Sequence, residues 1–292
     1  MKVIGFTFIR NAIRYDYPIE AAIRSILPLC EEVVVAVGES EDDTLALVQS
    51  IDPRKVRILR TVWNDELREG GRVLAEETNK ALAAVAEEAD WAIYIQGDEV
   101  LHEQYLPAVR RSLERYRTDA GVDGLLFDYR HFYGSYDYVG ATSRWYRHEV
   151  RVVRPGRGIY SYRDAQGFRK GDDQKLRVRP AGAEMYHYGW VKPPDAMQRK
   201  RANLDSLWHS DDWVERHVPA DADFDYRGII DALEPFEGTH PKVLQARIER
   251  RNWTFDYDIS FNQYGWKERI RQWIERHTGW RPGEYRNYRL LR

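Results

Sequence analysis

The first hundred residues alternate between two patterns of apolar and polar positions. Continuous apolar runs, typical of strands buried on both faces of a sheet, occupy residues 3–9, 32–37, 56–59 and 91–95. Apolar residues at helical spacing occupy residues 18–29, 43–51 and 72–88. This alternation of strands and helices predicts an α/β fold with a mostly parallel central sheet flanked by helices.

The pattern changes at about Gly121, where aromatic, arginine-rich segments begin. Residues 124–139, 144–154, 175–180 and 183–191 predict largely antiparallel strands that complete the sheet. Helical spacing returns at residues 194–208 and 266–277, and another helix is expected at Pro241, since proline suits a first helical turn. No linker interrupts the chain, so we expect one composite unit, with a main domain at 1–192 and a helical C-terminal extension at 193–292.

Polar residues directly follow three of the predicted strands: Arg10-Asn11, Gly38-Glu39-Ser40 and Gln96-Gly97-Asp98-Glu99. In open α/β sheets ligands bind beyond the carboxyl ends of the strands, so these residues are the first candidates for a site. The carboxylate of Asp98 can bind a hard cation such as Mg²⁺ or Mn²⁺. The alternative is that Asp98 and Glu99 are acids at the start of a helix at 104–116, where the helix dipole favours them.

Composition narrows the class of protein. The chain has 292 residues, enough for a large core, and its 45 Lys and Arg against 47 Asp and Glu give no basic field for nucleic acid. The single cysteine, Cys30, excludes a disulfide framework within the chain and a cysteine-based zinc site. No apolar run approaches the roughly 20 residues that span a bilayer, and an apolar strand, not a signal peptide, follows Met1-Lys2. We expect a cytoplasmic protein, soluble or peripheral to the inner face of the membrane.

Three stretches, IGFTFIRNA, VVVAVGESEDDT and DWAIYIQGDE, resemble family 2 glycosyltransferases with the GT-A fold in their order and intervals. HYGWVKPPDAMQRK and GTHPKV resemble a bacterial subset of such proteins. The resemblance implies a Rossmann-type sheet, a nucleoside diphosphate sugar donor, and a divalent cation, Mn²⁺ or Mg²⁺. It makes residues 1–120 the half that binds the nucleotide sugar and residues 121–192 the half on the acceptor side.

The resemblance also assigns roles to individual residues. The turn after the first strand, the base-binding loop and the third helix are matched by Ile9, Arg10, Asn11, Gly38, Glu39 and Asn79. Asp98 matches the metal-holding aspartate of a DxD-type signature, whose first aspartate is Gln96 here, followed by Gly97. The signature is therefore QxD; an amide can bond a ribose hydroxyl but adds no charge. Gly38-Glu39 replaces an acidic pair, which leaves the nucleotide base open.

A second metal ligand is implied by the segment EMYHYGWVK. In metal-dependent members of the fold a late histidine returns to the cation, and His187 matches it; an imidazole ligand favours Mn²⁺ over Mg²⁺. Without the resemblance, His187 is better read as a histidine hydrogen-bonded within a patch of Tyr186, Tyr188 and Trp190. Both interpretations stay open from the sequence.

Transfer of a sugar to a hydroxyl needs a base near the anomeric carbon. Two stretches before His187 supply carboxylates: YRDAQGFRK with Asp164, and KGDDQK with Asp172 and Asp173. We favour Asp164, because small residues that admit a substrate follow it, whereas Gly171-Asp172-Asp173 is typical of an exposed hairpin turn. Glu149 is a third candidate, although neighbouring basic residues can hold it in salt bridges.

The last predicted helix, WKERIRQWIERHTGW, has an apolar stripe of Trp266, Ile270, Trp273, Ile274 and His277. Such a stripe packs on the main domain or on a second subunit more often than on a membrane, so a homo-oligomer is one expectation. The alternative is a helix that lies in a membrane interface, where tryptophan and arginine are favoured.

The resemblance, together with these features, implies a metal-dependent glycosyltransferase, hexosyltransferase-like and inverting, that serves polysaccharide biosynthesis. Its expected partners are a nucleotide-sugar donor and a glycan or lipid-linked acceptor, and not nucleic acid. One alternative is a non-catalytic protein that binds nucleotide sugars or glycans, which the neutral Gln96 favours. The other is a nucleotidyltransferase, which normally has a glycine-rich loop after the first strand; FTFIRNAIRYDY has no glycine after Gly5.

Overall fold

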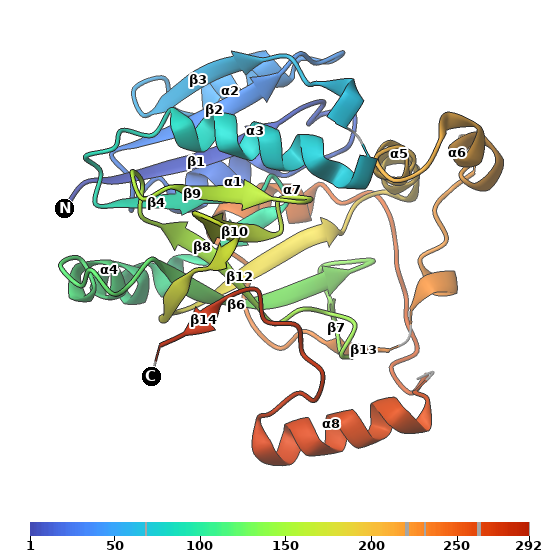
Figure 1. Ribbon diagram of the computed structural model, residues 1–292. Coiled ribbons are helices and arrows are strands. Elements are labelled where there is room, and N and C mark those ends of the chain that lie inside the picture. Colours follow the sequence, from blue (N-terminus) through green and yellow to red (C-terminus); the bar gives the residue numbers. More distant parts are fainter. Residues whose placement is uncertain (68, 220–221, 231, 262–263, 292) are drawn as a thin grey trace.

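The computed structural model describes residues 1–67, 69–219, 222–230, 232–261 and 264–291. At its centre lies a sheet of eleven strands with helices on both faces (Figure 1). The N-terminal part consists of β1 (Val3–Ile9), α1 (Ile19–Ile26), β2 (Glu32–Gly38), α2 (Thr44–Ile51), β3 (Val56–Thr61), α3 (Arg72–Ala83) and β4 (Trp91–Tyr94). All pairings among these four strands are parallel. The predicted α/β fold with a mostly parallel sheet flanked by helices is confirmed.

The apolar run in β2 shows why these residues form a central strand. Val33, Val34, Val35 and Ala36 have no exposed surface. Val33 and Val35 pack on the face covered by α1 and α2, while Val34 and Ala36 pack on the opposite face under α3. Two-sided burial therefore replaces the alternation of apolar and polar residues that a half-exposed strand would show.

The second half of the sheet contains both antiparallel and parallel pairings. Its strands are β5 (Glu99–Leu101), β6 (Gly124–Tyr133), β7 (Tyr138–Gly140), β8 (His148–Val153), β12 (Arg177–Trp190), β13 (Leu233–Pro235) and β14 (Arg289–Leu290). A separate small sheet contains β9 (Ile159–Tyr162), β10 (Gly167–Lys170) and β11 (Gln174–Lys175). The predicted strands at 175–180 and 183–191 differ from expectation, because both belong largely to β12, which pairs in parallel with β6 and antiparallel only with β5.

Two further differences from the sequence predictions concern where elements begin. Glu99 begins β5, and α4 (Leu106–Arg115) starts only after a short 3₁₀ turn, so the interpretation of Asp98 and Glu99 as helix-start acids is wrong. At Pro241 a 3₁₀ turn comes first and the helix α7 (Gln245–Glu249) follows.

The C-terminal extension also contains α5 (Pro194–Asp205), α6 (Asp211–His217) and α8 (Trp266–Thr278). The chain returns to the sheet twice here, where β13 pairs with β7 and β14 with β12. Within the described residues, none of the helices combines the length and hydropathy needed to cross a bilayer.

Candidate active site

A cavity of about 650 Å³ opens beyond the carboxyl ends of β1 and β4. Its walls come from the turns that follow these two strands, the end of β12, the turn between β9 and β10, and helix α5. Seven residues that the sequence nominated line it together: Ile9, Arg10, Gln96, Gly97, Asp98, Asp164 and His187. Four of them, Arg10, Gln96, Gly97 and Asp98, directly follow strand ends, where ligands bind in an open α/β sheet.

Antiparallel pairing of β12 with β5 brings His187 to Asp98. His187 lies opposite Glu99 in the ladder, and the amide of Tyr188 donates to the Asp98 carbonyl at 2.8 Å. As a result the His187 Nε2 and Asp98 Oδ1 atoms lie 3.8 Å apart. A Cβ at Gly189 would lie 2.7 Å from Nε2 and 2.8 Å from Asp98 Oδ2, so glycine is needed where the chain passes both groups.

Asp98 is a buried carboxylate surrounded by positive charge. Its Oδ2 accepts a hydrogen bond of 2.9 Å from the Lys200 ammonium group, which also donates to the Gly189 carbonyl at 2.9 Å. Burial opposes ionisation of Asp98, but the Lys200 and Lys192 ammonium groups outweigh it and hold the pKa of this carboxyl below its ordinary value. Asp98 is therefore an anion, with one oxygen bound to Lys200 and the other facing His187.

A chain of hydrogen bonds decides which nitrogen of His187 carries the proton. His131 Nε2 lies 2.8 Å from the Tyr146 carbonyl, which can only accept, so Nε2 is the donor. Burial and the neighbouring His187 lower the pKa of His131 to about 3, which leaves its Nδ1 as an acceptor. His187 Nδ1, at 3.1 Å, must then donate to it. Burial lowers the pKa of His187, so at neutral pH the imidazole is neutral and its lone pair lies on Nε2, the atom that faces Asp98.

This pair of acceptors fits a divalent cation. Two metal–ligand bonds of about 2.1 Å can join atoms 3.8 Å apart. One carboxylate oxygen and one neutral imidazole, whose other nitrogen is fixed by a hydrogen bond, form a donor set suited to Mn²⁺. In the part of the chain that the structure describes, no third His, Cys, Asp or Glu joins them.

Glu99, which the sequence suggested as an acid at the start of a helix, instead forms a buried ion pair. It has no exposed surface and forms an ion pair with Arg151, which is 1 % exposed, at 2.8 Å. Glu99 also accepts hydrogen bonds from the hydroxyl of Tyr129 at 2.7 Å and from the amide of Gln96 at 3.0 Å. The ion pair therefore fixes the backbone of the turn that presents Asp98.

Replacing Arg151 with methionine is expected to lower the free energy of unfolding by about 3–5 kcal/mol, because the Glu99 charge would stay buried without its partner. The control is Arg24→Met, which removes an exposed i,i+4 partner of Glu20. This variant is expected to change the free energy of unfolding by about 0.5 kcal/mol or less. Urea denaturation followed by circular dichroism measures both. Equally small changes would contradict a structural role for the Glu99–Arg151 pair.

The three aspartates considered as base lie in two places. Asp164 lines the cavity from the turn between β9 and β10, flanked by Arg163 and Ala165 at φ values of 56° and 62°. Gln96 Nε2 donates to the Ala165 carbonyl at 3.3 Å and so ties this turn to the QxD turn. Asp172 and Asp173 lie in the exposed turn between β10 and β11 and are not among the residues that line the cavity.

Glu149 is buried outside the residues that line the cavity, and its Oε2 has no hydrogen-bond partner in the described part of the chain. Burial raises the pKa of Glu149 to about 8, with Arg151 opposing the shift. This carboxyl is therefore largely protonated at neutral pH and is not held as a salt-bridged anion.

Four predicted nucleotide contacts lie outside the set of residues that line the cavity. Asn11 adopts φ 52° and its Oδ1 accepts from the Glu41 amide at 2.7 Å. Asn79 makes two hydrogen bonds with the backbone of Ser161, at 2.7 and 2.9 Å, and joins α3 to β9. Glu39 is exposed beside the first turn, with its carbonyl accepting from Arg10 Nε at 3.0 Å, and Gly38 packs against Trp63. None of these four lines the cavity.

Sequence reasoning missed several cavity residues, above all Trp63 and Lys200. Trp63 packs on Phe8 with ring centroids 5.9 Å apart, and the two rings form an apolar wall. Lys200 lies on α5 with its ammonium 5.0 Å from the ring of Tyr17. The motif HYGWVKPPDAMQRK contains Lys200, but only the fold shows that α5 turns back over Asp98.

No protein-family model and no curated protein matches the chain. Among solved structures it is similar to S. aureus TarS, with 14 % identity and a TM-score of 0.44 over 74 % of this chain and 42 % of that chain. A structure of TarS 1-349 with UDP gives 14 % identity and a TM-score of 0.42 over 74 % of this chain and 69 % of that chain. A structure of glucosyl-3-phosphoglycerate synthase from Mycobacterium tuberculosis with Mn²⁺, UDP and glucosyl-3-phosphoglycerate gives 20 % identity and a TM-score of 0.31. The match covers 46 % of this chain and 45 % of that chain. Because these similarities are low, a function has to rest on this chain's own site.

Proposed function

We propose that the protein is a metal-dependent glycosyltransferase that moves a sugar from a nucleoside diphosphate sugar to a hydroxyl of a glycan or lipid-linked acceptor. One observation carries this proposal: the lone pair of His187 Nε2 and the carboxylate of Asp98 face each other at 3.8 Å, in a cavity beyond the carboxyl ends of two parallel strands. The resemblance of IGFTFIRNA and DWAIYIQGDE to family 2 glycosyltransferases supports the donor class.

In this proposal the cation bound by Asp98 and His187 would act as a Lewis acid toward the departing diphosphate. The chain's own residues prepare the site. The Lys200 ammonium group donates a hydrogen bond of 2.9 Å to Asp98 Oδ2. This bond holds the carboxylate in place and adds a positive charge to the same wall of the cavity. His131 fixes the tautomer of His187 through the bond between their Nδ1 atoms. The wall of Phe8 and Trp63 offers the nucleotide base an aromatic surface on which to stack.

Asp164 is proposed as the base. The acceptor oxygen forms a bond to the anomeric carbon, the bond from that carbon to the diphosphate oxygen breaks, and the acceptor proton passes to Asp164. Attack from the face opposite the diphosphate would invert the anomeric centre. Gln96, which donates to the Ala165 carbonyl, couples the position of this turn to that of the metal-binding turn and lies where a ribose is expected.

A panel of nucleoside diphosphate sugars, each with and without Mn²⁺, is expected to raise the melting temperature for one donor and only when the metal is present. A ligand that binds only the folded state stabilises it by about 2.7 kcal/mol at a hundred times its Kd. Differential scanning fluorimetry measures the shift. An equal shift in EDTA would contradict the metal site, and no response to any nucleotide would contradict the donor class.

A second candidate is a non-catalytic protein that binds nucleotide sugars or glycans. It is favoured by Gln96, which lacks the charge of an aspartate, and by the Lys200 ammonium, which already neutralises Asp98 at 2.9 Å. A donor that binds without any release of nucleoside diphosphate over hours, in the presence of Mn²⁺ and candidate acceptors, would support this candidate over the transferase.

A further inference from the structure

Helix α8 docks on the protein through its polar side. Glu268 accepts hydrogen bonds from the amide and the hydroxyl of Ser143 at 2.8 and 2.6 Å, and Gln272 donates to the Ala141 carbonyl at 3.1 Å. Glu275, one turn further on, also faces the main domain. The expectation that the apolar stripe of this helix packs on the main domain is therefore wrong.

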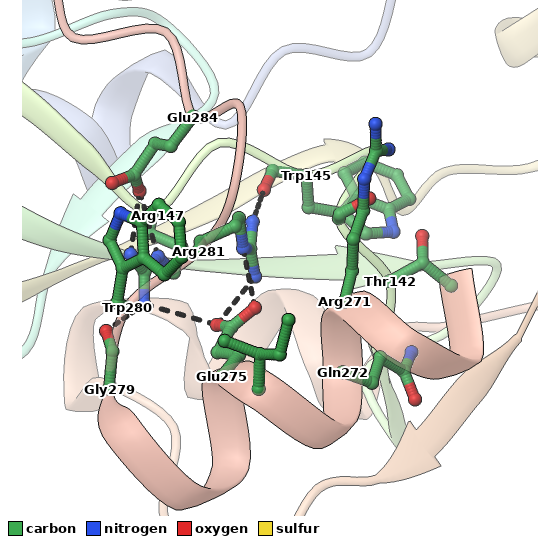
Figure 2. A network of polar contacts seen from close by, with 12 residues as sticks. Thr142, Trp145, Arg147, Arg271, Gln272, Glu275, Gly279, Trp280, Arg281 and Glu284 are labelled. Carbon is green, nitrogen blue, oxygen red and sulfur yellow. Dashed lines mark hydrogen bonds and ion pairs between the residues drawn. The ribbon is translucent and has the colours of Figure 1, made fainter. Parts of the chain in front are cut away.

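An ionic network anchors the same side of α8 (Figure 2). Glu275 pairs with Arg281 at 2.7 Å and with Arg147 of the main domain at 3.1 Å. Arg147 also pairs with Glu284 at 2.8 Å, and Arg281 donates to the Trp145 carbonyl at 2.6 Å. The two arginines and two glutamates therefore hold the helix by ionic contacts, and of the predicted apolar stripe Ile274 alone is half-buried.

The apolar side of α8 consequently faces solvent. Trp266, Ile270 and Trp273 are 69 %, 50 % and 62 % exposed, and their spacing places them on one stripe. Trp280, just beyond the C-cap Gly279, is 57 % exposed. Figure 1 shows α8 at the periphery of the molecule. Single exposed apolar residues are ordinary, but several large ones along one helical stripe mark an interaction surface.

Charge identifies the kind of partner. Helical spacing places Lys267 on one flank of the stripe and Arg269 and Arg276 on the other, whereas Arg271 lies toward the docked side, near Glu268. The two acids of the helix, Glu268 and Glu275, are bound to the main domain. Two carboxylates come near these cations, Glu234 to Arg276 and Glu268 to Arg271, each at 3.9 Å. The basic flanks therefore suit a negatively charged surface.

We propose that α8 is an interfacial helix that docks the protein on an anionic lipid bilayer, with Trp266, Ile270 and Trp273 in the interface. Tryptophan favours the headgroup region, and lysine and arginine on both flanks contact anionic headgroups. A second copy packed stripe against stripe would instead bring the basic flanks of two helices together, which like-charge repulsion disfavours. This inference does not depend on the proposed function, because docking requires neither nucleotide nor metal.

Co-sedimentation of the full chain with lipid vesicles tests the proposal. Wild type is expected to bind vesicles of phosphatidylcholine with phosphatidylglycerol, and to bind pure phosphatidylcholine at least tenfold more weakly. Trp266→Ser/Trp273→Ser is expected to lose binding at least tenfold. Arg269→Gln should weaken binding about fivefold, since a basic residue near an anionic surface contributes on the order of 1 kcal/mol.

A matched pair of variants controls for general surface effects. Ile270→Ser should weaken vesicle binding, whereas Ile13→Ser, which removes an equally exposed isoleucine elsewhere, should not; the two side chains are 50 % and 52 % exposed. Unchanged melting temperatures would show that the variants fold. Wild type that fails to bind anionic vesicles, or binds neutral vesicles equally, overturns the proposal. So does light scattering that shows a dimer dissociated by Trp266→Ser/Trp273→Ser, with no vesicle binding.

Discussion

Replacement of Asp98 by asparagine is expected to lower turnover at least a thousandfold. The asparagine has nearly the same shape, but it removes the negative charge opposite the His187 lone pair, so the cation would lose its anionic protein ligand. A metal that stabilises departing charge contributes several kcal/mol to the transition state, and about 4 kcal/mol corresponds to a factor of a thousand. Steady-state release of nucleoside diphosphate and calorimetric titration with Mn²⁺ measure turnover and metal binding separately.

Two controls make this result specific. Asp195→Asn removes an exposed aspartate on α5, paired with Arg199 at 2.9 Å, and should leave turnover and Mn²⁺ affinity near wild type. Since Asp98→Asn also leaves the Lys200 charge without its partner, Asp98→Asn/Lys200→Met separates that loss of stability from the loss of metal. Turnover of Asp98→Asn near that of wild type, or wild-type turnover that persists in EDTA, would contradict the assignment of Asp98 as a metal ligand.

The second large effect is expected for Asp164→Asn, which should lower kcat by about a hundredfold to ten-thousandfold, the usual contribution of a positioned base. The affinity for the donor should stay near wild type, because the amide keeps the size of the side chain and the Ala165 carbonyl still accepts from Gln96. Single-turnover kinetics with saturating donor, together with a separate binding titration, distinguish a loss of chemistry from a loss of binding.

Asp172→Asn and Asp173→Asn are matched controls, since each removes one carboxylate from the nearby turn between β10 and β11. Both are expected to keep kcat within a factor of about two, because surface substitutions away from a site have small effects. If either of them, or Glu149→Gln, produces the loss expected of Asp164→Asn, the assignment of the base moves to that residue.

The local pattern of apolar and polar residues was sufficient to predict most of the elements in the N-terminal half of the sheet. It also predicted which edge of the sheet carries the candidate site. The apolar runs at β1, β2 and β4 predicted buried parallel strands, because a strand covered on both faces has no polar side. Asp98 and Gln96 followed from that prediction, since ligands collect beyond strand ends. The short strand β5 was missed: three residues beginning with a glutamate give no periodic signal, and Glu99 is buried there with its charge paired to Arg151.

Contacts between distant residues could not be predicted in the same way. Lys200 and Asp98 are 102 positions apart, and nothing in a run of letters ties a helical lysine to a particular carboxylate. Asn79 illustrates the reverse case: its match to the family predicted a nucleotide contact, but its amide makes two hydrogen bonds with the backbone of Ser161.

By itself the sequence determined the alternation of strands and helices, the strand ends that carry Ile9, Gln96 and Asp98, and the amphipathic character of the last helix. Only the tertiary structure decided that the lone pair of His187 faces Asp98, that Lys200 of α5 binds Asp98, and that the apolar side of α8 faces outward. The physical reason is that periodicity depends on neighbours within one element, whereas hydrogen-bond direction, ion pairing and burial depend on which other elements the fold places beside it.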